Sequence, residues 1–275
     1  MNNERRDWVL LATFGFVVAC AGMSASRWVT GSLVSFWAMC CFDAITLGGL
    51  WVPAFMALSR GAVGVSVLIG SSVLVRRLWK TSGFVSRLKK SAVAEPSARL
   101  AKLFDDLSLS QHVVVLATEV PLAFCVGLLR PRICLTTGLS AILSDPELKA
   151  VLLHEDHHRR RFDPLRGLLA DMLAAMLFFL PVAAELRHLF LTATELAADR
   201  HAVQSVGRPP LAGALHKILT HPLAPHIAPV GIAGISATQV RIAELLGDRP
   251  TVVQVSAKSL IISSAVVMLV CMAVL

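Results

Sequence analysis

The sequence contains few charged residues. Lys, Arg, Asp and Glu together make up 16% of its 275 residues, whereas soluble globular domains carry about 25%. Hydrophobic residues make up 55%, and the mean hydropathy is +0.68. This composition excludes an ordinary soluble domain and predicts a membrane protein.

Acidic residues are scarcer than basic ones, which gives a net charge of +8 and a pI near 9.6. One basic cluster has no acidic neighbour before Glu95: Arg76, Arg77, Lys80, Arg87, Lys89 and Lys90. We expect no nucleic-acid partner, because no basic surface with interleaved aromatic residues and no nucleic-acid-binding motif is recognisable. Anionic headgroups of a lipid bilayer account for the charge better, and the positive-inside rule places the residues after this cluster on the cytoplasmic side.

Cysteine offers no metal site, because none of the six cysteines occurs at the short spacing of a zinc-binding pair. Four of them fall in apolar runs. The other two, Cys125 and Cys134, fall in expected strands and should stay reduced in a cytosolic domain.

Apolar runs long enough to approach a bilayer's thickness occur at both ends of the chain. They are Trp8–Ser24, Trp28–Leu58, Gly61–Val75 and Leu260–Leu275. The sequence therefore predicts three transmembrane helices in residues 1–78, a polar domain in 79–257, and a C-terminal transmembrane helix in 258–275.

The motif His154-Glu155-Asp156-His157-His158 carries the chemistry. Residues four apart lie on one face of a helix, so His154 and His158 can bind one zinc ion (Zn²⁺) while Glu155 acts as the general base. Ser144 and Glu147 have capping-box spacing, which predicts a helix start before the motif. Asp163-Pro164 predicts a new helix, so the motif helix should end near Phe162. The expected reaction is peptide hydrolysis.

A zinc site needs a third protein ligand, and a catalytic site leaves its fourth position to water. Glu195 is the best candidate, because Glu195 and Asp199 share a helical face among small apolar residues. Asp199 is expected to accept a hydrogen bond from a ligating histidine and so fix its orientation. The rival ligands are Glu185, His188 and Asp171, and His157 could also face the metal.

The apolar segment Leu165–Ala184 lies between the motif and Glu195. One simple crossing would put His154 and Glu195 on opposite sides of a membrane, although both must hold one ion. We therefore expect a buried or membrane-dipping helix that turns back at Pro181.

Three parts of the chain resemble the BlaR/MecR-type integral-membrane metallopeptidases: Ala123–Leu135, Asp145–Glu155, and Glu195 with Asp199. The similarity to the HtpX and CAAX-protease group is more distant. The resemblance implies His154, His158 and Glu195 as zinc ligands and Glu155 as the base. It also implies that a substrate peptide lies along a strand made of Ala123, Phe124, Cys125, Val126 and Gly127.

The fold implied is an α-helical membrane protein with an α+β zincin-like metallopeptidase domain, in which a small strand pair packs on the motif helix. The sensor-type members carry an extracellular penicillin-binding domain after the last membrane helix, whereas this chain ends at Leu275. A β-lactam-sensing role is therefore not expected.

The function expected is that of a zinc-dependent metalloendopeptidase in the cell membrane, with its catalytic domain on the cytoplasmic side. Its partners would be protein or peptide substrates, with a cytosolic regulator as one candidate. Two alternatives stay open: a non-catalytic zinc-binding membrane signalling protein, and a processing or quality-control protease similar to the HtpX and CAAX enzymes.

Overall fold

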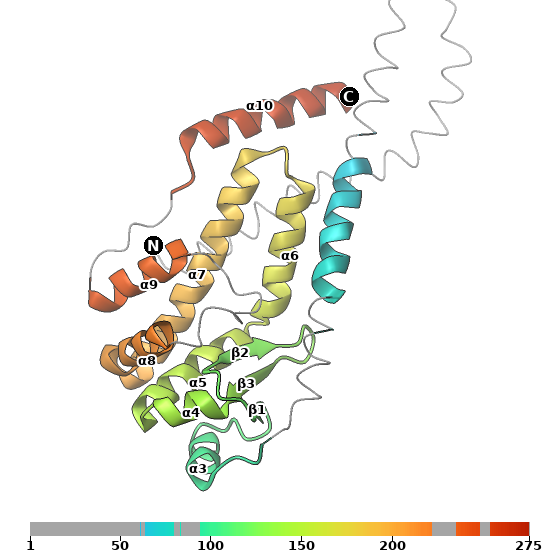
Figure 1. The fold of residues 1–275 in the computed structure, drawn as a ribbon. Coiled ribbons are helices and arrows are strands. Elements are labelled where there is room, and N and C mark those ends of the chain that lie inside the picture. The colour runs from blue at the N-terminus through green and yellow to red at the C-terminus, as the bar shows by residue number, and fades with distance from the viewer. Residues whose placement is uncertain are drawn as a thin grey trace, which may run out of the picture. The chain divides into compact units, whose positions relative to one another are not determined.

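A computed structural model describes residues 61, 64–79, 83, 94–221, 235–247 and 254–274 (Figure 1). The chain divides into two compact units, residues 1–67 with 260–275 and residues 68–259. The first two predicted membrane spans lie outside the described residues, and residues 64–75 of the third belong to a helix over residues 64–79. None of the helices in the described ranges combines the length and the apolar character needed to span a bilayer.

The second unit is mostly helical and contains a small sheet, as an α+β domain should. Its strands are β1 (Val113–Leu116), β2 (Ala123–Val126) and β3 (Arg132–Thr136), in the order β1-β3-β2. β1 runs parallel to β3, and β2 is antiparallel to it with Phe124 opposite Cys134. Gly127 ends β2 with φ of +103°, a conformation that favours glycine and turns the chain towards β3. β2 is therefore an edge strand of this sheet.

The motif lies on α5 (Asp145–Arg160), whose start and end are set by local sequence. The Glu147 carboxylate accepts hydrogen bonds from the Ser144 backbone N–H at 2.8 Å and its hydroxyl at 2.7 Å. At the other end Phe162 adopts a left-handed conformation, with φ of +55°, which breaks the helix. Both predicted boundaries are confirmed.

The hydrophobic core lies between α5, the sheet and α3 (Ala98–Asp106). Leu148 and Leu152 on α5 are fully buried with Ile133 and Leu135 of β3. The short helix α4 (Thr137–Ile142) follows β3 directly. Gly138 in α4 has no room for a side chain, because a Cβ atom would lie 2.0 Å from the Glu119 carbonyl oxygen. Because Leu148 and Leu152 of α5 share this core with β3, the core fixes α5 beside the sheet.

The segment between the motif and Glu195 is a helical hairpin. α6 (Asp163–Met176) and α7 (Pro181–Val206) lie side by side and are joined by residues 177–180 (Figure 1). The expected reversal at Pro181 is confirmed, and the long α7 supplies the returning arm. Asp171, which faces Arg77 at 3.0 Å and also pairs with Arg187, links the hairpin to the helix over residues 64–79.

Three further helices follow: α8 (Arg208–Thr220), α9 (Ile235–Leu246) and α10 (Ala257–Val274). α8 follows α7 after Gly207 alone and has prolines in its first turn, where a missing N–H costs nothing. α9 is followed directly by Gly247, which has φ of +91°. α10 coincides with the predicted C-terminal membrane helix, whose crossing of a bilayer stays a prediction.

Candidate metal centre

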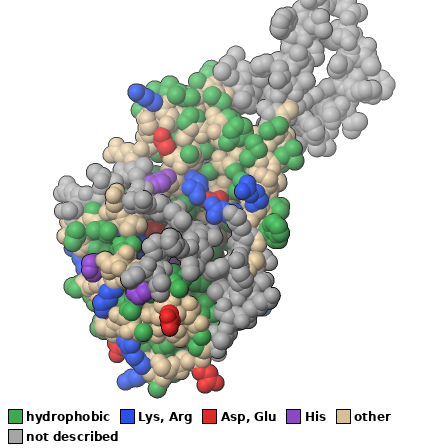
Figure 2. All heavy atoms as spheres, viewed as in Figure 1, with side chains coloured by type: hydrophobic (Ala, Val, Ile, Leu, Met, Phe, Trp, Pro, Cys, Tyr) green, Lys and Arg blue, Asp and Glu red, His purple; other side chains and the backbone are tan. Residues whose placement is uncertain are grey.

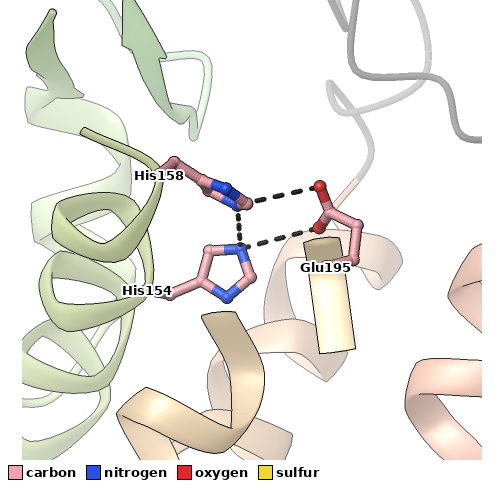
Figure 3. A group of neighbouring side chains, drawn as sticks. All are labelled: His154, His158 and Glu195. Carbon is pink, nitrogen blue, oxygen red and sulfur yellow. Dashed lines mark hydrogen bonds and ion pairs between the residues drawn. The ribbon is translucent and has the colours of Figure 1, made fainter. Parts of the chain in front are cut away.

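Three side chains converge between α5 and α7 (Figure 3). The Nε2 atoms of His154 and His158 lie 3.1 Å apart. Glu195 places Oε2 at 3.6 Å from the His154 Nε2 atom and Oε1 at 3.7 Å from the His158 Nε2 atom. The structure thus brings together the three predicted ligands. Both histidines are buried, so the centre is protected from bulk solvent.

The spacing of these atoms can be compared with the spacing of ligands around a tetrahedral zinc ion. Zinc bonds of about 2.0–2.2 Å at tetrahedral angles place neighbouring ligand atoms about 3.3–3.6 Å apart. The 3.1 Å between the two Nε2 atoms is close to that range, and each Nε2 atom lies 3.6 or 3.7 Å from a different oxygen of Glu195. One ligand atom from each of the three residues lies within 4.8 Å of the other two. No other group of three metal-binding side chains occurs in the part of the chain that the structure describes. Two imidazoles and one carboxylate are consistent with zinc and leave one coordination position open.

Each histidine faces a carboxylate on the side away from the centre. The Nδ1 atom of His158 lies 2.9 Å from Asp163 Oδ2 in a buried hydrogen bond. The Nδ1 atom of His154 lies 2.9 Å from Asp199 Oδ1, in an ion-pair contact rather than a well-directed hydrogen bond. A carboxylate at Nδ1 favours the tautomer whose Nε2 lone pair faces the metal.

Asp163 is a site residue that the sequence reasoning missed. Phe162 occupies the cap position of α6, and Asp163 is the first residue of that helix. Its Oδ1 atom accepts a hydrogen bond from Arg166 at 2.8 Å, while Oδ2 faces His158. The signal that could have revealed it is an acidic residue directly after the motif helix ends.

Arg241 on α9 was also missed. Its Nε and Nη2 atoms donate to the two oxygens of Asp199 at 2.7 and 2.8 Å, and its Nη1 atom lies 3.0 Å from Glu195 Oε2. An arginine inside a short, largely apolar helix is a signal that an acidic partner is buried nearby.

These charges set the ionisation of the centre. Burial raises the pKa of Asp199, but His154 and Arg241 outweigh burial and lower that pKa well below its usual range. Burial likewise raises the pKa of Glu195, but the two histidines and Arg241 lower it overall. Burial lowers the pKa of His154, but the carboxylates of Asp199 and Glu195 raise it overall. The centre therefore favours a positive charge between these carboxylates, which a metal ion can provide by displacing a proton.

Glu155 lies on α5 beside the first ligand and is 8% exposed. Burial chiefly raises the pKa of the Cys134 thiol to about 11, and the Glu155 carboxylate raises it further. The same two causes, in the same order, raise the pKa of the Cys125 thiol. The helix that carries Glu155, α5, packs against β2 and β3.

The predicted substrate strand, Ala123 to Gly127, coincides with β2 and the glycine that ends it. Its side chains from Ala123 to Val126 are half-buried, and β2 packs against α5. Its role in binding a peptide stays a prediction.

The rival ligands lie elsewhere. Glu185 accepts hydrogen bonds from the Ser256 N–H at 2.9 Å and the Ser259 hydroxyl at 2.6 Å. Asp171 pairs with two arginines, and His188 is not part of the converging group. His157 packs its ring against His201, with 5.3 Å between the ring centroids, and is also outside that group.

We expect Asp163→Asn to weaken zinc binding about 10–100-fold, because outer hydrogen-bond partners of metal ligands contribute on that scale. The measurement is competition for zinc with a coloured chelator. Asp171→Asn is the matched control, since it also removes an ion-paired carboxylate from α6 without contacting a ligand. Equal zinc affinity for Asp163→Asn and the wild type would show that His158 needs no carboxylate.

Comparison with known families matches this geometry. No curated protein matches the chain. The family model described as BlaR1 peptidase M56 matches residues 55–212, a range that includes α5 and Glu195 and extends over more than half of the 275 residues. The chain therefore belongs to the M56 family of zinc metallopeptidases.

Proposed function

We propose that this protein is an integral-membrane zinc metalloendopeptidase of the gluzincin type, which hydrolyses peptide bonds in protein substrates near the cytoplasmic surface. One observation carries the proposal: three ligand atoms converge while Glu155, next in sequence to the first ligand, remains outside the ligand set. A structural zinc site would close with four protein ligands. Three ligands beside a carboxylate favour hydrolysis.

The residues divide the work of the reaction. His154, His158 and Glu195 would hold zinc, which when bound lowers the pKa of water and polarises a carbonyl group. Glu155 accepts the proton of the attacking water and then passes it to the leaving amine. Asp163 and Asp199 keep the imidazole rings in position throughout.

The edge of β2 supports a binding mode for the substrate. An extended peptide can add to an edge strand through main-chain hydrogen bonds, which tolerates many side chains. β2 packs against α5, the helix that carries Glu155. A peptide on this edge would lie beside the general base.

A membrane location is supported by the composition and by exposed apolar side chains. Figure 2 shows hydrophobic side chains over the helix of residues 64–79 and the joined end of the α6–α7 hairpin. Trp79 is 81% exposed and Phe178 59%. Ile261 on α10 is also largely exposed. We propose the division expected from the sequence: spans within residues 1–78, a cytoplasmic catalytic domain in 79–257, and a final span in 258–275.

The test of function is a proteomic comparison of cells that produce the wild type or Glu155→Gln. New protein N-termini present only with the wild type would identify substrates. Their sequences would also separate a regulatory protease, which cuts few proteins, from a quality-control or processing enzyme. Identical sets of N-termini would contradict the proposal.

Topology gives a separate prediction. Single cysteines placed at Lys149 and Gln204, in a variant without the native cysteines, should react with a membrane-impermeant reagent from the same side as a cysteine at Lys89. The reason is that α5 and α7 must meet at one metal centre. Reaction of the first two positions from opposite sides would mean that residues 165–184 cross the membrane.

A further inference from the structure

Arg241 contacts the centre from a helix outside the family match, which ends at residue 212. Its side chain is only 16% exposed, and the guanidinium group lies against two carboxylates of α7. Two of its nitrogens form a paired contact with Asp199, which positions the group firmly. The third nitrogen is directed at Glu195.

The contact with Glu195 involves one oxygen only. Arg241 Nη1 lies 3.0 Å from Oε2. The Oε1 atom lies 3.7 Å from the His158 Nε2 atom. Each oxygen of this carboxylate thus faces one histidine, since Oε2 lies 3.6 Å from the His154 Nε2 atom, but only Oε2 also lies beside the buried Arg241 cation.

We infer that Arg241 is a positioning residue: it holds Glu195 Oε2 and leaves Oε1 as the single oxygen that binds zinc. This inference rests on the proposed zinc site. A carboxylate can bind a metal through one oxygen or through both. Binding through both would occupy the position that a catalytic site keeps for water. By engaging Oε2, Arg241 keeps that position open.

The position of Arg241 depends on how α9 docks on α7. Arg200 on α7 forms an ion pair with Glu244 on α9, three residues after Arg241. That pair joins the same two helices but contacts none of the three ligands. It therefore provides a control that separates the docking of α9 from the contact with Glu195.

The experiment uses the full chain in detergent, loaded with cobalt(II) alone, whose visible spectrum reports the coordination number. We expect Arg241→Met to weaken the visible bands and shift them to shorter wavelength, because both oxygens of Glu195 can then bind. Arg241→Lys keeps the positive charge, but its single ammonium nitrogen cannot replace the three guanidinium nitrogens that contact Asp199 and Glu195. For Arg241→Lys we expect a cobalt spectrum between those of the wild type and Arg241→Met. We also expect its zinc affinity to be about 10-fold or more below that of the wild type.

Arg200→Met should leave the cobalt spectrum as in the wild type. The inference is overturned if the spectra of both Arg241 variants superimpose on that of the wild type, or if Arg200→Met changes the spectrum as much as they do. If Arg241→Met does not fold without metal, the cobalt spectrum of Arg241→Lys is compared with that of the wild type, and superimposable spectra overturn the inference. Failure of the wild type to bind zinc or cobalt would instead contradict the proposed zinc site itself.

Discussion

Glu155→Gln should lower the rate of peptide hydrolysis at least about 100-fold while the zinc content stays at the wild-type level, because removing a general base costs on that scale. The amide has nearly the shape of the carboxylate but cannot accept the proton of water. Glu155 is not among the three converging ligands, so its loss should not release the metal. The measurements are cleavage of fluorescently labelled casein and zinc content after dialysis.

A matched control for this variant lies on the same helix. Glu147→Gln also converts a glutamate of α5 to an amide, but its carboxylate contacts Lys217 at 2.7 Å and Ser144, away from the centre. We expect that variant to keep its activity. Full activity in Glu155→Gln would exclude the proposed hydrolytic mechanism, and equal losses in both variants would indicate a general effect on α5.

The motif helix could be predicted because its determinants are local. The Ser144–Glu147 contact joins residues three apart, and the break at Phe162 precedes a proline-containing helix start. Glu195 could be predicted for a related reason, since two carboxylates one turn apart on an apolar helix need a buried partner. Features that depend on residues three or four apart in the sequence, such as helix boundaries and paired side chains on one helical face, can be predicted from the sequence alone.

Two residues of the centre, Asp163 and Arg241, could not be identified from such short-range patterns. Asp163 already had a satisfactory local explanation as a helix cap, and nothing nearby indicated that its side chain turns back to His158. Arg241 lies 42 residues from Asp199 in the sequence, and their contact exists only when α9 docks on α7. The sequence shows that buried acidic groups need partners, but the fold decides which partners reach them.

The hairpin shows how the requirement for one metal centre can correct a topology predicted from hydropathy. Leu165–Ala184 has the length and apolar character of a membrane span, but one metal centre requires His154 and Glu195 to meet. The structure divides the segment between α6 and α7, and the returning arm carries Glu195 back to α5. The hydropathy pattern alone contains no information about that return.

Loss of any one ligand should have the largest effect on metal binding. We expect His154→Ala, His158→Ala and Glu195→Ala each to weaken zinc binding by more than the roughly 100-fold upper cost of losing an outer hydrogen-bond partner. The physical reason is that two protein ligands hold an ion far less well than three. Zinc content after dialysis, with circular dichroism to verify folding, is the measurement.

The controls for this prediction are the side chains that compete with Glu195 for the role of third ligand. Glu185→Ala and His188→Ala should keep their zinc, since neither side chain belongs to the converging group. If Glu195→Ala kept its zinc and either of these two variants lost it, the third ligand would be wrongly assigned. A chelator should likewise abolish cleavage by the wild type, and added zinc should restore it, because Glu155 as a base has no activated water to deprotonate without the metal.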